Sequence, residues 1–183
     1  PGMTVINPCD YNQTNAATIA IADHHGPVYL RFGRPSWPIV IPESMPFVIG
    51  KGILMQEGTD VTIIATGHLV AYAMEAVQKL QEQGISAELI NIHTIKPLDE
   101  EIILDSVSKT RCVVTAEEHQ RNGGLGDSVA QLLARKNPTH QEYVAVNDSF
   151  GERGTPEQLL LKYGLGPENI ISAVQEVMKR KGL

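Results

Sequence analysis

The residues VTIIATGHLVAYAMEAVQKLQEQGISAELINI, at positions 61–92, contain one complete strand–helix–strand pattern. The nearly continuous apolar run at 61–66 is typical of a strand that is covered on both faces, and residues 87–92 have the same character. Between them we expect a helix from about Leu69 to Gln83, with Gly84 as its stop. The apolar stripe predicted for this helix consists of Val70, Met74, Val77 and Leu80.

The same alternation continues toward the C-terminus. Further strands are expected at 112–117 and 143–147, and further helices at about 99–109, at 125–136 and from Pro167 onward. Residues 155–158, Thr-Pro-Glu-Gln, have the spacing of a capping box with proline at the first helical position, which predicts one more helix start. The short strand expected at 53–56 would form a hairpin with 61–66 and add one antiparallel edge strand. The pattern therefore predicts an α/β fold: a mainly parallel, doubly wound sheet with helices on both faces and one antiparallel edge strand.

A smaller strand–helix–strand pattern comes before this region. Strands are expected at 3–6 and 28–32, with a helix between them that reaches about His24. Asp10 and Gln13 have the spacing of a capping box at the start of that helix. Two parallel strands and one helix cannot bury both faces of a sheet, so this unit needs neighbours from elsewhere.

The domain organisation follows from this shortage of partners. We expect residues 1–44 to be the C-terminal remnant of a larger domain together with a linker, beginning at a cut end, and residues 45–183 to form a complete domain. The stretch 35–50 contains four prolines, which excludes a helix or a central strand there. Its apolar side chains are expected to lie along a groove: Trp37, Ile39 and Ile41.

Charge and composition exclude several classes of protein. The 183 residues include 15 Lys and Arg against 21 Asp and Glu, and a net charge of −6 makes a nucleic-acid partner unexpected. No apolar run approaches the roughly 18 residues that suggest a membrane span. Cys9 and Cys112 are too few for a disulfide framework, and no signal-peptide pattern precedes them. We expect buried thiols in a cytoplasmic protein.

Polar side chains collect where the predicted strands end, because these ends meet at one edge of an open α/β sheet. They are His68, His93, Glu117, Glu118, His119 and Asp148. Histidines with carboxylates can bind a transition metal or act as general acid and base. Strands also simply end in water, and no two of these residues have the spacing that makes a metal signal strong. We therefore expect no metal site in this chain.

A glycine-rich loop, Gly123-Gly124-Leu125-Gly126, lies between a predicted strand and a predicted helix. Open amides at a helix N-terminus attract phosphate, and Asp148 follows the next strand, as in dinucleotide-binding folds. Two features disagree with that motif: its third glycine would fall at Val129, and six residues, 118–123, separate the strand from the glycines. The alternative is that the glycines permit close loop packing and positive φ angles.

Two arginines, Arg31 and Arg34, stand at the end of the second strand. A guanidinium group at the carboxyl edge of a strand can bind two oxygens of a phosphate monoester at once. An ordinary surface ion pair is the simpler alternative.

Long blocks of the chain resemble consecutive parts of transketolase. They are PGMTVINPCD (1–10), GPVYLRFGRP (26–35), IGKGILMQEGTDVTIIATG (49–67), TIKPLDEE (94–101), TAEEHQRNGGLGDSVAQLL (115–133) and FGERGTPEQLLLKYGL (150–165). The resemblance implies the end of the pyrimidine-binding domain followed by the C-terminal domain. It also implies an enzyme of the pentose phosphate pathway that uses thiamine diphosphate and a divalent metal, Mg²⁺ or Ca²⁺, to transfer a two-carbon ketol group from a ketose phosphate to an aldose phosphate.

Only one functional residue of the family transfers to this sequence. Arg34 matches the arginine that binds the phosphate of the sugar substrate. The family's catalytic residues, cofactor-binding residues and metal ligands belong to stretches outside these 183 residues, so the fragment alone is expected to be inactive and to carry no cofactor. The resemblance implies a homodimer, or an assembly with the N-terminal half that binds thiamine diphosphate.

Two other interpretations stay open. The chain also resembles deoxyxylulose phosphate synthase and the beta subunit of 2-oxo acid dehydrogenases, although in those families the acidic pair is usually followed by glycine, whereas His119 follows Glu118 here. Alternatively, the chain is a non-catalytic regulatory module that binds a nucleotide or anion at residues 123–126.

Overall fold

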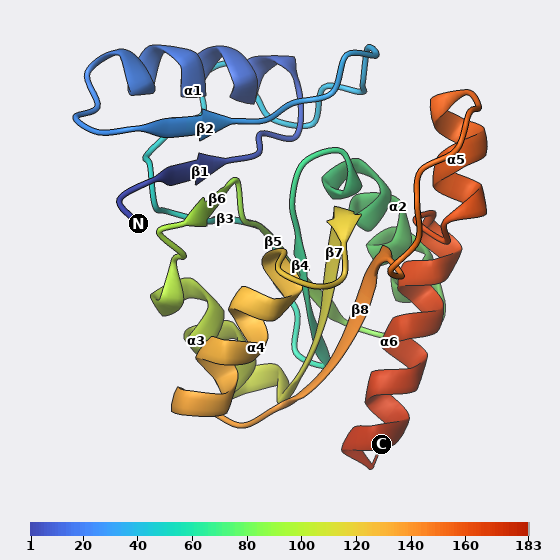
Figure 1. The fold of residues 1–183 in the computed structure, drawn as a ribbon. Helices are drawn as coiled ribbons and strands as arrows, with labels where there is room; N and C mark the ends of the chain where they lie inside the picture. Colours follow the sequence, from blue (N-terminus) through green and yellow to red (C-terminus); the bar gives the residue numbers. More distant parts are fainter. Residues whose placement is uncertain (183) are drawn as a thin grey trace.

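The computed structural model describes residues 1–182 and contains a five-stranded, mostly parallel sheet (Figure 1). Its strand order is β3-β5-β4-β7-β8. The strands are β3 (Ile53–Gln56), β4 (Val61–Ala65), β5 (Ala87–Asn91), β7 (Cys112–Gln120) and β8 (His140–Val146). The helices of this part are α2 (Leu69–Glu82), α3 (Glu100–Thr110), α4 (Leu125–Lys136), α5 (Pro156–Lys162) and α6 (Pro167–Lys181). The expected α/β architecture is confirmed.

Each face of this sheet packs on its own hydrophobic core. On one face Ile63, Leu89 and Val114 join the buried sides of α2 and α6. On the other face Ile64 and Val113 pack against α3 and α4. Successive residues of β4 thus enter opposite cores, which is why the run 61–65 is apolar at four of five positions and fully buried.

The edge strand of this sheet pairs differently from the prediction. Strand β3 is antiparallel, as expected, but its partner is β5 and not β4, so the expected hairpin 53–66 is wrong. Strand β5 lies between β3 and β4 in the sheet. The chain therefore passes the position of β5 on its way from the end of β3 to the start of β4. In α2 three residues of the predicted stripe, Val70, Val77 and Leu80, are buried as expected, but Met74 is 39% exposed and the buried Ala73 takes its place.

A second, three-stranded sheet carries the N-terminal unit, with the order β2-β1-β6. Strands β1 (Thr4–Ile6) and β2 (Val28–Leu30) are parallel and are joined by α1 (Tyr11–Ala22), as expected. Strand β6 (Thr94–Lys96), for which the sequence has no strand pattern of its own, pairs antiparallel with β1 and was not predicted. The unit thus receives one neighbour from the rest of the chain, whereas β2 remains an edge strand among the described residues.

The proline-rich stretch after β2 forms neither helix nor strand and is tied to α1 by Asp10. One carboxylate oxygen of Asp10 accepts the amide of Gln13 at 2.8 Å and caps the helix. The other oxygen accepts the amides of Val40 and Ile41, each at 2.7 Å. Gln13 itself accepts the amide of Cys9, one residue before the position that a capping box uses.

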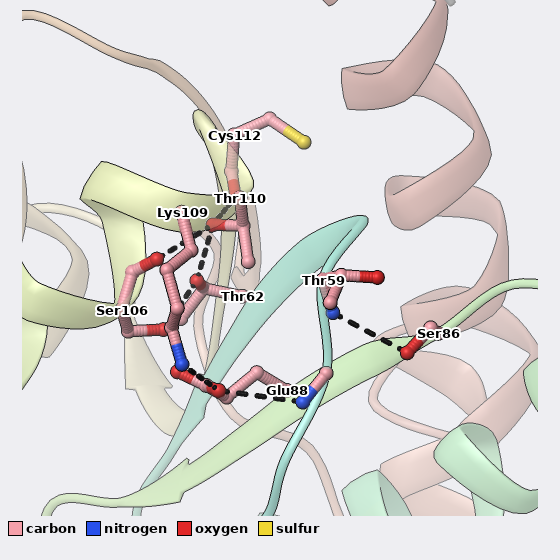
Figure 2. Close-up of polar contacts among 9 residues, drawn as sticks. Thr59, Thr62, Ser86, Glu88, Ser106, Lys109, Thr110 and Cys112 are labelled. Atoms are coloured by element: carbon pink, nitrogen blue, oxygen red, sulfur yellow. Dashed lines mark hydrogen bonds and ion pairs between the residues drawn. The ribbon is translucent and has the colours of Figure 1, made fainter.

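A polar cluster, buried except for the Lys109 side chain, lies at the amino ends of β4, β5 and β7 (Figure 2). Thr62 shares hydrogen bonds of 2.6 Å with both Ser106 and Thr110. Glu88, whose side chain is 2% exposed, accepts from Lys109 at 2.5 Å and from the amide of Gly58 at 3.3 Å. We call these five side chains, Thr62, Glu88, Ser106, Lys109 and Thr110, the amino-edge cluster.

Both cysteines are buried and free, as expected. Within residues 1–182, none of the helices has the length and apolar character that crossing a membrane requires.

Candidate functional site

The carboxyl ends of β2, β4 and β7 meet where the N-terminal unit lies against the main sheet (Figure 1). The segment after β2, residues 31–37, runs over the loop that follows β4 and the end of β7. His68 comes from the loop and Glu118 from β7. Three chain segments that are far apart in the sequence therefore build this part of the surface.

His68 forms the centre of these contacts. Its Nδ1 lies 3.0 Å from the carboxylate of Glu118. Its ring stacks on the indole of Trp37, with centroids 4.5 Å apart and 17° between the planes. The Trp37 Nε1–H donates to the backbone carbonyl of His68 at 3.0 Å. A Cβ atom added to Gly33 would stand 1.9 Å from the ring, so only glycine allows the backbone to approach this closely.

The charge on Glu118 is stabilised by this arrangement. The hydrogen bond from His68 lowers the pKa of Glu118, and the nearby Arg31 acts in the same direction, whereas partial burial opposes them. Arg31 also donates to the backbone carbonyl of Glu118 at 2.6 Å. Arg31 therefore binds the end of β7 through this backbone carbonyl.

Arg34 lies between these fixed points. It is exposed, and no hydrogen bond or ion pair found among residues 1–182 uses its guanidinium group. Together with Asp10, Phe32, Trp37 and His68 it lines a cavity of about 540 Å³. A free guanidinium at such a cavity can bind an anionic group such as a phosphate ester.

The glycine-rich loop already holds an internal anion. The buried carboxylate of Glu117 accepts the amides of Leu125 and Gly126, each at 2.8 Å, at the N-terminus of α4. Burial raises the pKa of Glu117, and these two amides partly offset that effect. A Cβ on Gly124 would lie 2.2 Å from this carboxylate, and Gly123 has a φ of +82°. The glycines therefore serve close packing and a left-handed turn, and the amides expected to cradle a phosphate are occupied by Glu117.

Of the remaining polar residues at the strand ends, His119 lines a cavity with Glu117, whereas within residues 1–182 His93 and Asp148 line no cavity with either glutamate. His93 is buried and bonds to Thr94 at 3.0 Å, while the exposed His119 bonds to the backbone of Gln120. Asp148 is exposed and lies in a left-handed turn with a φ of +45°. Among the residues described by the structure, no three His, Cys, Asp or Glu side chains come together as metal ligands.

The contact between His68 and Glu118 was not anticipated. The sequence placed both residues at the same edge of the sheet, but they are 50 positions apart. No sequence motif links His68 or Glu118 to Trp37, because the three residues lie in three separate segments of the chain. The only signal was that both follow predicted strands.

Residues 50–170 match the family described as transketolase, C-terminal domain. A 6-deoxy-6-sulfo-D-fructose transketolase subunit from Clostridium sp. (strain MSTE9) is 46% identical over 181 residues, 99% of this chain and 56% of the relative. A putative transketolase C-terminal section from Methanocaldococcus jannaschii is 42% identical over 99% of this chain and 57% of that relative. A solved structure, "Split gene transketolase, inactive beta4 tetramer", matches with a TM-score of 0.95 and 42% identity, covering 98% of this chain and 59% of that one.

More distant relatives carry another name. A 1-deoxy-D-xylulose-5-phosphate synthase from Geobacter sulfurreducens is 37% identical over the whole chain, which spans 29% of that relative. The chain spans a little over half the length of the transketolase relatives above. The family match covers the main sheet with most of its helices, and the relatives extend the similarity through the N-terminal unit. The chain belongs to the transketolase C-terminal domain family.

Proposed function

We propose that this chain is the C-terminal part of a transketolase, an enzyme that transfers a two-carbon ketol group between sugar phosphates. The observation that carries this proposal is the match, along 99% of the chain, to two relatives named as a transketolase subunit and a transketolase C-terminal section. These relatives are similar to the N-terminal unit as well as to the main sheet. The comparison therefore supports the whole arrangement of this chain and not only one domain of it.

The role proposed for Arg34 is to bind the anionic end of the sugar. Its free guanidinium group lines a cavity beside two aromatic side chains, Phe32 and Trp37. A phosphate bound by such a group would orient the sugar while the reacting carbon atoms lie further away. Because the Clostridium relative is named for a sulfonated sugar, a sulfonate is the second anion to test.

The cofactor is proposed to be held by another polypeptide segment. Thiamine diphosphate would supply the carbanion stabilisation that ketol transfer needs. Among the described residues no three His, Cys, Asp or Glu side chains come together as metal ligands, and the resemblance assigns the diphosphate site to stretches outside these 183 residues. The working enzyme is accordingly proposed to be an assembly of this chain with an N-terminal half that holds thiamine diphosphate and Mg²⁺ or Ca²⁺. Two copies of each part would make the complete enzyme.

The test is to combine this chain with a transketolase N-terminal half and to measure ketol transfer to ribose 5-phosphate. Transfer that requires thiamine diphosphate and both chains supports the proposal. In a parallel assay with pyruvate and glyceraldehyde 3-phosphate, formation of 1-deoxyxylulose 5-phosphate would identify the synthase, which the second group of relatives represents. Binding of cofactor with neither product would count against both activities.

Arg34 is tested in the same assembly. Losing charge-assisted hydrogen bonds to a phosphate costs about 1.5–3 kcal/mol. We expect Arg34→Ala to raise the KM for ribose 5-phosphate roughly 10- to 100-fold and to leave the KM for unphosphorylated ribose unchanged. Arg34→Lys should recover part of the loss, because lysine keeps the charge but not the two-pronged geometry. An equal rise in KM for both acceptors would show that Arg34 does not bind the phosphate.

A further inference from the structure

The segment that carries Arg34 is fixed on both sides of that residue. Before Arg34, Arg31 donates to the carbonyl of Glu118 at 2.6 Å, and Gly33 packs directly on the ring of His68. After Arg34, Trp37 stacks on the same ring and donates to the carbonyl of His68. All four contacts end on only two residues, His68 and Glu118.

These two residues are themselves joined. The hydrogen bond between Nδ1 of His68 and the carboxylate of Glu118 measures 3.0 Å, and the His68 side chain is only 13% exposed. The aromatic stack continues to Tyr72 on α2, whose ring meets Trp37 edge-on at 5.5 Å. The support therefore extends from segment 31–37 into the main sheet and its first helix.

We propose that His68, held by Glu118, is a positioning residue that fixes segment 31–37 in the conformation in which Arg34 binds the anionic group of the sugar. This inference rests on the phosphate-binding role proposed for Arg34 above. In this proposal the loop after β4 and the end of β7 contribute to the affinity for the substrate. They do so without contact to the reacting atoms. Because an ordered guanidinium loses less conformational entropy on binding, the expected gain is in affinity.

The charged groups around the ring fit this role. Glu118 on β7 faces Nδ1, Arg31 lies beside Glu118, and Arg34 and Asp10 line the adjoining cavity. Both oxygens of Asp10 accept backbone amides, and the hydrogen bonds and ion pairs found within residues 1–182 include none between Asp10 and Arg34. Among these groups Arg34 alone has no hydrogen-bond or ion-pair partner within residues 1–182, so its guanidinium group is the one that can bind a ligand.

The first measurement uses the complete chain alone and does not depend on catalysis. Trp37 is the only tryptophan, so its fluorescence reports on the stack with His68. We expect His68→Ala to make Trp37 at least twofold more accessible to quenching by acrylamide, and Glu118→Gln to have a smaller effect in the same direction. The matched control is His140→Ala, at an exposed histidine on β8, which should leave quenching unchanged. Unchanged quenching in His68→Ala would overturn the proposal.

The second measurement is a double-mutant cycle in the assembly with the N-terminal half, read by calorimetry with ribose 5-phosphate. His68→Ala should weaken binding about tenfold when Arg34 is present, and should have no effect in the Arg34→Ala background, because His68 acts through Arg34. Additive effects would overturn the positioning role. Binding of unphosphorylated ribose should not change in either variant, and a loss there would show general damage to the fold and likewise contradict the proposal.

Kinetics separate this proposal from the proposed function. If ketol transfer occurs, His68→Ala should raise the KM for the phosphorylated acceptor about tenfold while kcat changes less than twofold. A fall in kcat with an unchanged KM would overturn the positioning role. If no transfer occurs although ribose 5-phosphate binds, the proposed function fails, whereas the calorimetric cycle still decides the role of His68.

Discussion

His93 is a buried histidine that is neutral in the folded protein. Its ring packs against the ring of Phe47, with the two centroids 4.2 Å apart. His93 as a whole is only 1% exposed. Burial lowers the pKa of His93 to about 4, although Asp99 opposes this effect. In the unfolded chain the same group has a pKa of about 6.5. Below that pH the unfolded chain takes up a proton that the folded protein does not, so the free energy of unfolding falls as pH falls from about 6.5 toward 4.

We therefore expect His93→Leu to remove this pH dependence of the free energy of unfolding. From pH 7 to pH 4.5 the free energy of unfolding of the wild type should fall by roughly 2–3 kcal/mol more than that of the variant. This size follows from the difference between the folded and unfolded pKa of His93. Urea denaturation of both proteins at the two pH values measures this. Parallel losses in the two proteins would show that His93 is not the group that titrates.

Gly124 is required by the carboxylate that it faces. In Gly124→Ala the new Cβ would lie 2.2 Å from Glu117, which would have to leave the amides of Leu125 and Gly126. We expect a loss of about 1–3 kcal/mol in the free energy of unfolding. Gly151→Ala is the matched control, because nothing lies within 4 Å of its added Cβ, and it should change stability by less than about 0.5 kcal/mol. Equal stability of the two variants in chemical denaturation would contradict this account.

At the scale of elements, the amino-edge cluster joins α3 to β4 and β5. Burial alone would raise the pKa of Glu88, but the hydrogen bonds from Lys109, Ser106 and the amide of Gly58 outweigh it and lower the pKa. The stabilisation is therefore complete above the unfolded pKa of about 4.3 and is lost as pH falls through the lower folded value. Figure 2 shows how the Lys109 ammonium group reaches Glu88 from α3.

We expect Lys109→Met to reduce the free energy of unfolding by about 1–3 kcal/mol at pH 7, because it leaves a buried carboxylate with one charged partner fewer. The difference from the wild type should shrink as pH falls below about 4.3 toward the lowered pKa of Glu88, because protonation removes the charge that Lys109 stabilises. Lys179→Met is the control, since its ion pair with Glu176 is exposed and 4.0 Å long. A difference that stays constant from pH 7 to pH 3 would exclude Glu88 as its source.

The elements that could be predicted are those with a strong local pattern. Helices α2, α4 and α6 and strands β4 and β5 follow from apolar periodicity and capping residues, which act within a few positions of the chain. Strand β6 was missed because its three residues, 94–96, become a strand only by pairing with β1, about 90 positions away. The partner of β3 was wrong for the same reason: strand pairing is decided by the whole sheet and not by the nearest neighbour in sequence.

The candidate site shows the same limit. The resemblance to transketolase pointed to Arg34, and the ends of the predicted strands brought His68 and Glu118 to one edge. Which of these side chains touch is set by how the N-terminal unit lies on the main sheet, and no local pattern contains that information. Gly33 illustrates this, because its lack of a side chain acquires a meaning only beside His68.

At the scale of the whole molecule, the N-terminal unit presents one open strand edge among the described residues, together with exposed apolar side chains. Strand β2 has a partner on one side only among the described residues, and Tyr29 on this strand is 55% exposed. Tyr11 and Ile19 on α1 are exposed to 72% and 66%. An open strand edge beside apolar surface is typical of a place where another chain or segment packs. This agrees with the assembly proposed above.

We expect Tyr29→Ser to weaken association with a transketolase N-terminal half about 5- to 30-fold, since a partly exposed aromatic side chain at an interface contributes about 1–2 kcal/mol. Stability of the chain itself should change little, because Tyr29 lies outside both hydrophobic cores. Leu161→Ser is the matched control, because Leu161 is 74% exposed on α5 and, like Tyr29, lies outside both hydrophobic cores, while Figure 1 shows α5 well apart from β2, on the right of the view. Sedimentation velocity across a range of concentrations gives both dissociation constants. If both substitutions weaken association equally, or neither does, the partner does not dock on the β2 edge.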